Sequence, residues 1–279
     1  MDKDILQKLK EEQLKILDYT VKICEENSLE YFLIGGTLLG AVRHRGYIPW
    51  DDDLDLAMPR KDYEKFIKIF LNQDNGKYIL DTNNHSKYYW LPFLKVRNKN
   101  TIYQENLQKN YKGNLGIWVD IFPLDNGNKE ISKLQSFQFR FVKNSRYLIS
   151  MKCDVGVPKK SKGKTLIFKL LTILPKKFWV WLQNTIMKLN HNDNSKYFIN
   201  LGSQYGMFKQ THLKDKYYPS KKLEFEGRTL SVPNDYDYVL TQIYGKNYME
   251  LPPVEKRITH NPMYIKFEDG KELKFDEKI

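Results

Sequence analysis

The chain has 279 residues, of which 41% are hydrophobic and 14% aromatic. This length suffices for one large domain with a substantial core, and the composition excludes a disordered or low-complexity protein. Its two cysteines, Cys24 and Cys153, have no paired or metal-binding spacing, which excludes a disulfide framework and a zinc motif. The N-terminus has acidic residues and no continuous apolar core, so we expect a cytoplasmic protein without a signal peptide.

The formal charge of +12 is concentrated in one region. Eleven basic residues and one acidic residue lie between Lys143 and Asn190, and the rest of the chain is nearly neutral. The excess of positive charge is therefore a property of this segment and not of the whole surface.

The first half of the chain predicts a helix followed by mixed helices and strands. Residues 3–27 space their apolar side chains as one face of a helix requires. YFLIGG (31–36) predicts a buried strand that stops at a glycine turn, and TLLGAVRH after it predicts a helix. A further helix is expected at 60–72, after Pro59, and further strands in YILDT, YWLPFLKVRN, TIYQE and GIWVDIFPL.

The second half begins with a segment that lacks strand patterns. Residues 128–192 favour helices, and we expect 128–200 to form a basic, aromatic helical insert whose apolar runs are too short to span a membrane. KLEFEGRTLSVP then predicts a hairpin around Glu226-Gly227, and DYDYVLTQIYG a short helix ended by Gly245. We expect an α+β fold with a core in 1–127, the insert in 128–200, and a C-terminal part, 201–279, that completes the core.

Four carboxylates lie within five positions, at Asp51, Asp52, Asp53 and Asp55. Alternation in DLDLA places Asp53 and Asp55 on one side of a strand, with leucines on the other side. Such a cluster is costly unless a cation binds or water screens it, so a solvated acidic turn is the alternative interpretation.

Two features favour the cation. The Gly35-Gly36 turn between a strand and a helix exposes backbone N–H groups that favour a phosphate. Asp120 sits amid apolar residues in IWVDIF, where a carboxylate is costly unless it is paired or bound to metal. We therefore expect Asp53, Asp55 and Asp120 to hold Mg²⁺ or Mn²⁺, with a salt bridge from Asp120 to a lysine or arginine as the alternative.

The run GGTLLGAVRHRGYIPWDDDLDLAMPRKDYEKF (35–66) resembles the signature of the LicD family, phosphocholine transferases related to the fukutins. FLKVRNKNTIYQE, GIWVDIFPLDN and LPPVEKRITHNP also resemble blocks of that family. The resemblance implies a nucleotidyltransferase-like mixed sheet flanked by helices. It also implies transfer of phosphocholine, or a related phospho-alcohol, from CDP-choline or another CDP-alcohol, with release of CMP.

The implied acceptor is a sugar hydroxyl of a lipid-linked, cell-surface glycan, such as a lipopolysaccharide or teichoic acid precursor. In this reaction the three carboxylates are the catalytic metal ligands, and Asp120 is our hypothesis for the group that takes the hydroxyl proton. The candidate substrate-binding residues are the glycine turn, nearby basic groups, one aromatic side chain and the basic C-terminal cluster: Gly35, Gly36, Thr37, Arg43, His44, Trp50, Lys95, Lys256, Arg257 and His260.

The basic insert interleaves its lysines with Trp, Phe and Leu rather than forming a nucleic-acid motif, so we expect no nucleic acid as a partner. Basic amphipathic helices of this kind are typical of an anionic membrane surface, which predicts a peripheral protein at the inner face of the membrane. A helical subdomain with a basic solvated face is the alternative. For the activity, the alternatives are a nucleotidyltransferase that releases pyrophosphate and a catalytically silent module that binds glycan or lipid.

Overall fold

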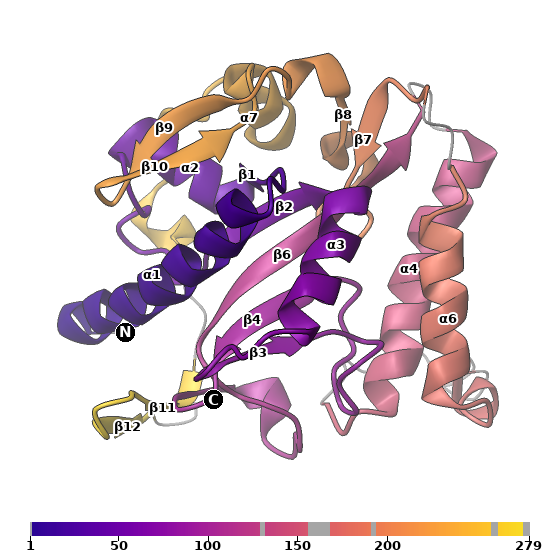
Figure 1. Ribbon diagram of the computed structural model, residues 1–279, viewed down its shortest axis with the longest axis horizontal. Coiled ribbons are helices and arrows are strands. Elements are labelled where there is room, and N and C mark those ends of the chain that lie inside the picture. Colours follow the sequence, from indigo (N-terminus) through magenta and orange to yellow (C-terminus); the bar gives the residue numbers. More distant parts are fainter. Residues whose placement is uncertain (1, 129–131, 156–167, 191–193, 258–261, 276–279) are drawn as a thin grey trace.

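A mixed sheet forms the centre of the protein in the computed structural model, which describes residues 2–128, 132–155, 168–190, 194–257 and 262–275 (Figure 1). Its main path runs β1-β2-β6-β4-β3, and β7 and β8 extend it from the far end of β6. Only β2 and β6 run parallel among the described strands of this sheet. The bounds are β1 (Phe32–Leu33), β2 (Asp55–Pro59), β3 (Tyr78–Asp81), β4 (Leu94–Asn98), β6 (Trp118–Gly127), β7 (Tyr197–Ile199) and β8 (Thr211–Leu213).

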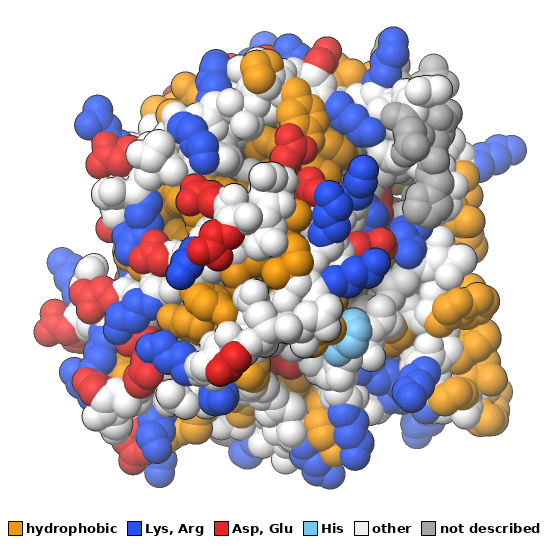
Figure 2. All heavy atoms as spheres, in the orientation of Figure 1, with side chains coloured by type: hydrophobic (Ala, Val, Ile, Leu, Met, Phe, Trp, Pro, Cys, Tyr) orange, Lys and Arg blue, Asp and Glu red, His pale blue; other side chains and the backbone are white. Residues whose placement is uncertain are grey.

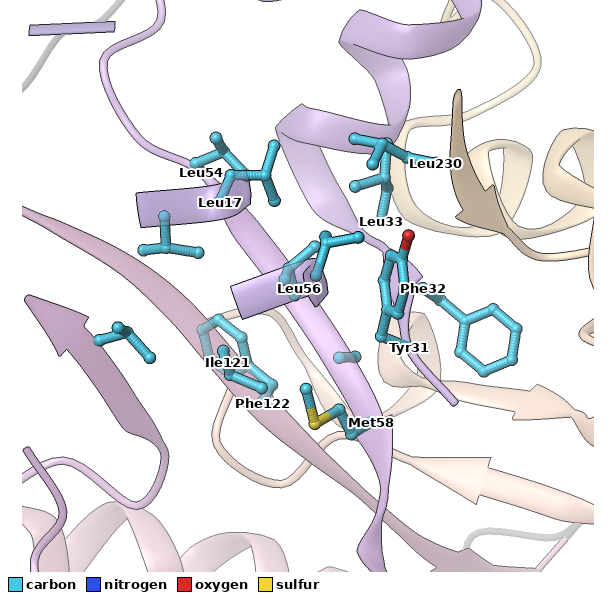
Figure 3. Packing of buried hydrophobic residues seen from close by; sticks show 14 of the residues in the cluster. Leu17, Tyr31, Phe32, Leu33, Leu54, Leu56, Met58, Ile121, Phe122 and Leu230 are labelled. Carbon is cyan, nitrogen blue, oxygen red and sulfur yellow. The ribbon is translucent and has the colours of Figure 1, made fainter. Parts of the chain in front are cut away.

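Helices α1 (Lys3–Glu26) and α3 (Arg60–Leu71) lie side by side on one face of the sheet (Figure 1). Between them and the sheet, Leu17, Leu33, Leu56 and Ile121 are fully buried (Figure 3). These residues come from α1, β1, β2 and β6, so one apolar layer fixes the helix against the strands that carry the acidic residues. The predicted α+β class and mixed sheet are confirmed.

The C-terminal third packs against the N-terminal elements. The predicted hairpin is present as β9 (Lys221–Phe225) and β10 (Arg228–Val232), and its turn residues Glu226 and Gly227 both have positive φ, as a tight hairpin turn requires. Helix α7 (Tyr236–Tyr244) ends at Gly245, as predicted, and packs on α2 (Gly35–His44).

The remaining strands form a small separate sheet. Strand β11 (Pro262–Lys266) pairs with both β5 (Ile102–Glu105) and β12 (Glu272–Lys274). The short 3-10 helices are η1 (Asn106–Gln108), η2 (Met207–Gln210), η3 (Lys214–Lys216) and η4 (Val254–Lys256).

The insert contains two paired helices, α4 (Lys133–Met151) and α6 (Lys176–Met187), which stand beside the sheet (Figure 1). A second apolar cluster, with Ile149, Trp179 and Val180 at its centre, holds them together. The predicted helix in TLIFKLLTIL is described only from Phe168 onward, and the lysines at 159–164 lie outside the described residues. None of the helices in the described part of the chain is long and apolar enough to cross a membrane.

Candidate active site

The acidic loop before β2 is held in place by α1. Lys10 Nζ donates hydrogen bonds to the carbonyl oxygens of Ile48 and Pro49, each at 3.2 Å. Gln13 Nε2 donates to the carbonyl oxygen of Asp52 at 2.9 Å. A helix that the sequence indicates only as a packing element therefore also anchors the backbone of the loop.

The acidic residues alternate in their exposure. Asp51, Asp53 and Asp55 are partly buried, whereas Asp52 is buried and accepts a hydrogen bond of 2.9 Å from the Tyr103 hydroxyl. The strand begins at Asp55, two residues later than the alternation in DLDLA predicts. The alternation of exposure nevertheless continues through the loop before it.

Asp55 and Asp120 are paired in register across the parallel strands β2 and β6. Burial raises the pKa of Asp55 well above its usual value, and the negative charges of Asp53, Asp120 and Asp51 raise it further. Thr37 supports this position, because its hydroxyl oxygen accepts a 2.9 Å hydrogen bond from the backbone N–H of Asp55. These four aspartates, Asp51, Asp53, Asp55 and Asp120, are called the carboxylate cluster below.

The glycine turn lies directly against the carboxylate cluster. Gly35 begins α2 with a positive φ of 55°, and no side chain caps the start of this helix. A Cβ atom added at Gly36 would lie 2.7 Å from Asp51 Oδ2, and one added at Gly35 would lie 3.4 Å from Asp55 Oδ2. Only glycine therefore fits at position 36 without displacing the Asp51 carboxylate. Phosphate binding by this turn stays a prediction.

Lys95 forms an ion pair with Asp120, and both side chains are buried. Lys95 Nζ lies 2.6 Å from Oδ1 and 2.9 Å from Oδ2 of Asp120, and Trp118 Nε1 donates to Oδ2 at 3.3 Å. The ammonium also lies 4.0 Å from the centre of the Trp118 ring. Burial lowers the pKa of Lys95, and the charge of Asp120 opposes that shift. Lys95 thus contacts the carboxylate cluster through Asp120. The alternative interpretation of Asp120, a salt bridge to a lysine or arginine, is confirmed, and Lys95 is its partner.

The donor set suits a hard divalent cation. The predicted ligands Asp53, Asp55 and Asp120 offer only oxygen atoms. The negative charges of Asp53 and Asp120 repel an ionised Asp55, and a bound cation would relieve this repulsion. Within the described residues, no three acidic, histidine or cysteine side chains already converge to metal-ligand spacing. Metal binding at these three residues therefore remains a prediction that requires their side chains to move.

Arg43 and His44 are engaged with each other and with the chain after α7. Arg43 Nη1 donates to the carbonyl oxygens of Tyr248, at 2.9 Å, and Glu250, at 3.1 Å. Arg43 Nε donates to His44 Nε2 at 2.9 Å. Burial, together with the nearby charges of Arg43 and Lys10, lowers the pKa of His44. These contacts fix α2 to the C-terminal part, and a role for either residue in diphosphate binding stays a prediction.

The C-terminal basic cluster is only partly described. The guanidinium of Arg257 lies 4.5 Å from the centre of the Trp50 ring, so one candidate residue covers another. Lys256 is exposed on η4, and His260 lies outside the described residues.

Several residues near the carboxylate cluster carry no motif in the sequence. The rings of Tyr205 and Tyr244 meet edge to face at 6.1 Å, and burial raises the pKa of both phenols, with a further contribution from the charge of Asp55. Arg146 of α4 interacts electrostatically with Asp120. Isolated tyrosines and one arginine in a basic helix give no pattern that distinguishes them from surface residues, so sequence reasoning missed them.

The chain is similar to proteins of one family. The family described as LicD/FKTN/FKRP, nucleotidyltransferase domain, matches residues 28–160. The lipopolysaccharide cholinephosphotransferase LicD of Haemophilus influenzae is 31% identical over 264 residues, which cover 91% of this chain and 96% of that protein. An uncharacterized protein of Rickettsia typhi, RT0683, is 26% identical over 53% of each chain. The ribitol 5-phosphate transferase FKRP of Homo sapiens is 48% identical over 44 residues, which are 16% of this chain and 9% of FKRP.

Proposed function

Because the chain belongs to the LicD family, we propose that it transfers phosphocholine, or a related phospho-alcohol, from a CDP-alcohol to a sugar hydroxyl of a glycan. Members of this family are phosphotransferases, and this chain is one of them. The similarity over 91% of the chain to a lipopolysaccharide cholinephosphotransferase is the observation that carries the proposal. The in-register pair Asp55 and Asp120 supplies the chemistry.

In the proposed reaction the sugar hydroxyl attacks the phosphorus that carries the alcohol. A new P–O bond forms to the sugar oxygen, the bond to the bridging oxygen of the diphosphate breaks, and CMP leaves. Bound Mg²⁺ or Mn²⁺ would neutralise the diphosphate and polarise the phosphorus. Asp53, Asp55 and Asp120 would hold that cation, and the uncapped start of α2 at Gly35 and Gly36 would face the phosphate oxygens.

The hydroxyl proton goes to Asp120 in this proposal. Lys95, which lies within 2.9 Å of both Asp120 oxygens, orients the carboxylate. An Asp120→Asn variant with near-normal rates across the pH range would contradict this assignment, because asparagine accepts no proton.

Two other activities use parts of the same site. A nucleotidyltransferase would need the same carboxylates but would release pyrophosphate, so only the products separate it from the proposed transferase. A catalytically silent glycan-binding or lipid-binding module would need no acidic cluster. The cost of holding Asp55 against Asp53 and Asp120 argues against that module, since a scaffold gains nothing from the repulsion.

We expect CMP release from CDP-choline, or from one other CDP-alcohol, when the protein is incubated with Mg²⁺ and a glycan acceptor. The measurement is mass spectrometry of CMP, pyrophosphate and the modified glycan, over a panel of CDP-alcohols and nucleoside triphosphates. Chelation by EDTA is expected to lower the rate at least about a hundredfold, and added Mg²⁺ or Mn²⁺ to restore it. Pyrophosphate release from a triphosphate would instead support the nucleotidyltransferase, and no turnover of any donor would support the silent module.

The insert is proposed to place the enzyme on the anionic inner face of the membrane, where a lipid-linked acceptor would be presented. Ile173 is 81% exposed and Trp181 is 61% exposed, although both are large apolar residues. Lys169 and Lys177 are exposed close to them in the chain. Hydrophobic side chains gather with Lys and Arg along the edge of the molecule where α6 lies (Figure 2). This combination suits an anionic lipid surface, with about 1 kcal/mol per basic residue near it.

The protein is expected to float with anionic vesicles in a density gradient and to remain unbound with neutral vesicles. Ile173→Glu and Trp181→Glu are each expected to lower the bound fraction about tenfold, because each adds a charge to the apolar surface. Leu107→Glu is the matched control, since Leu107 is 55% exposed on η1, outside the insert. Equal binding to both vesicle types, or equal effects of all three substitutions, would contradict the membrane proposal.

A further inference from the structure

Arg146 projects from the face of α4 that is directed at the body of the protein. Val142, Arg146 and Ile149 follow one another at the four- and three-residue spacings of a single helix face, and Cys153 comes four residues later, just past the end of α4. Val142 packs in the cluster that includes β7, and Cys153 Sγ donates to the carbonyl oxygen of Tyr89 at 3.8 Å. Arg146 is half-buried between these two contacts.

The guanidinium of Arg146 forms no ion pair and no hydrogen bond within the described residues, although the charge of Asp120 acts on it from a greater distance. Two other arginines of this protein, by contrast, form ion pairs with aspartates. Arg60 pairs with Asp125 at 2.7 Å, and Arg97 pairs with Asp81 at 2.8 Å. Burial lowers the pKa of Arg146, but an arginine keeps its charge in a protein. A half-buried charge without a direct ion pair is costly, so a bound anion is expected to compensate it.

The Tyr89 side chain supplies a second, independent observation. Tyr89 is fully buried, and its hydroxyl has no hydrogen-bond partner in the described part of the chain. Buried hydroxyls normally have a hydrogen-bond partner, so this one calls for a partner from outside the described residues. Tyr89 interacts electrostatically with both Asp120 and Arg146, so its hydroxyl lies in the region that these two side chains share.

We propose that Arg146, with the Tyr89 hydroxyl, binds a phosphate of the nucleotide diphosphate donor next to Asp120. This inference rests on the proposed function and adds that the insert contributes a substrate-binding group, which is separate from any contact with lipid. The planar guanidinium matches two phosphate oxygens, and the phenol donates one more hydrogen bond. The positive charge of the Arg146 guanidinium would also offset the repulsion between the diphosphate and the carboxylate cluster.

Calorimetric binding of CDP, inorganic pyrophosphate and cytidine to the full chain tests the proposal without turnover. Arg146→Met is expected to weaken binding of CDP and pyrophosphate roughly ten- to a hundredfold and to leave cytidine binding unchanged. Arg146→Lys is expected to retain part of the affinity. Arg140→Met is the matched control, because Arg140 is exposed on the same helix. Wild-type affinity of Arg146→Met for pyrophosphate would overturn the inference.

Tyr89→Phe keeps the test decisive if Arg146→Met does not fold. Removing a hydroxyl that has no partner is expected to leave the unfolding midpoint unchanged or higher, and to weaken pyrophosphate binding several-fold. Unchanged pyrophosphate binding in both Tyr89→Phe and Arg146→Lys would overturn the inference. Failure of the proposed function would give a different result. The wild-type protein would then still bind CDP through Arg146 but would release no CMP from any CDP-alcohol.

Discussion

An Asp55→Asn variant is expected to lose transfer activity by roughly three orders of magnitude, and at the same time to be more stable than the wild type in metal-free buffer. Activity falls because a carboxylate that holds the cation contributes several kcal/mol to the transition state, at about 1.4 kcal/mol per tenfold. Stability rises because burial and the charges of Asp53, Asp120 and Asp51 disfavour an ionised Asp55 in the folded chain. Asparagine has no charge to bury.

The pH dependence of unfolding separates this explanation from a general improvement in packing. The folded-state pKa of Asp55 lies well above its unfolded value of about 4. The unfolded chain therefore releases the proton first, and the metal-free wild type loses stability as pH rises from about 4 through the raised pKa. Asp55→Asn should show a flatter profile over that range, measured by urea unfolding at each pH.

Asp215→Asn is the control for this experiment, because Asp215 is exposed and lies outside the carboxylate cluster. It should change neither the rate nor the pH profile. Added Mg²⁺ should stabilise the wild type more than Asp55→Asn, since the variant lacks one ligand. Wild-type activity in Asp55→Asn, or lower metal-free stability than the wild type at pH 7, would contradict the proposed role of Asp55.

Much of this architecture follows from local patterns in the sequence. The glycine pair that opens α2, the alternation that ends at Asp55, and the Glu226-Gly227 turn each depend on a few neighbouring residues, and the structure has all three. Backbone geometry at glycine and the period of a strand act over short distances, so the sequence suffices for them. The resemblance of the 35–66 run to the LicD family is likewise confirmed by the comparisons.

The pairing of distant residues could not be predicted in the same way. The register that sets Asp55 opposite Asp120 depends on how β2 and β6, which are separated by α3, β3, β4, β5 and η1, come together as the parallel pair. Lys95 was a candidate for phosphate binding and Asp120 for a metal or an ion pair, but only β4 beside β6 joins them. Tertiary packing brings the phenols of Tyr205 and Tyr244 and the guanidinium of Arg146 close enough to interact electrostatically with the carboxylate cluster, and such packing leaves no local pattern.

A Lys95→Met variant is expected to lose about 3 to 5 kcal/mol of folding stability in metal-free buffer, because it leaves Asp120 buried without its cation. Urea unfolding measures this loss. Transfer activity should fall as well, since the Asp120 carboxylate loses the contacts that orient it. Lys95→Arg, which keeps a positive charge, should retain more stability than Lys95→Met.

The double variant Lys95→Met/Asp120→Leu decides what the buried pair is for. If folding does not depend on the pair, replacing both charges by apolar groups of similar size should cost little stability, because desolvation offsets most of the attraction in a buried ion pair. We therefore expect the double variant to regain most of the stability lost in Lys95→Met and to remain without transfer activity. A double variant as unstable as Lys95→Met would instead assign the pair a structural role. Recovery of stability without activity means that the protein keeps an ion pair that its fold does not need, because the carboxylate is required for the reaction.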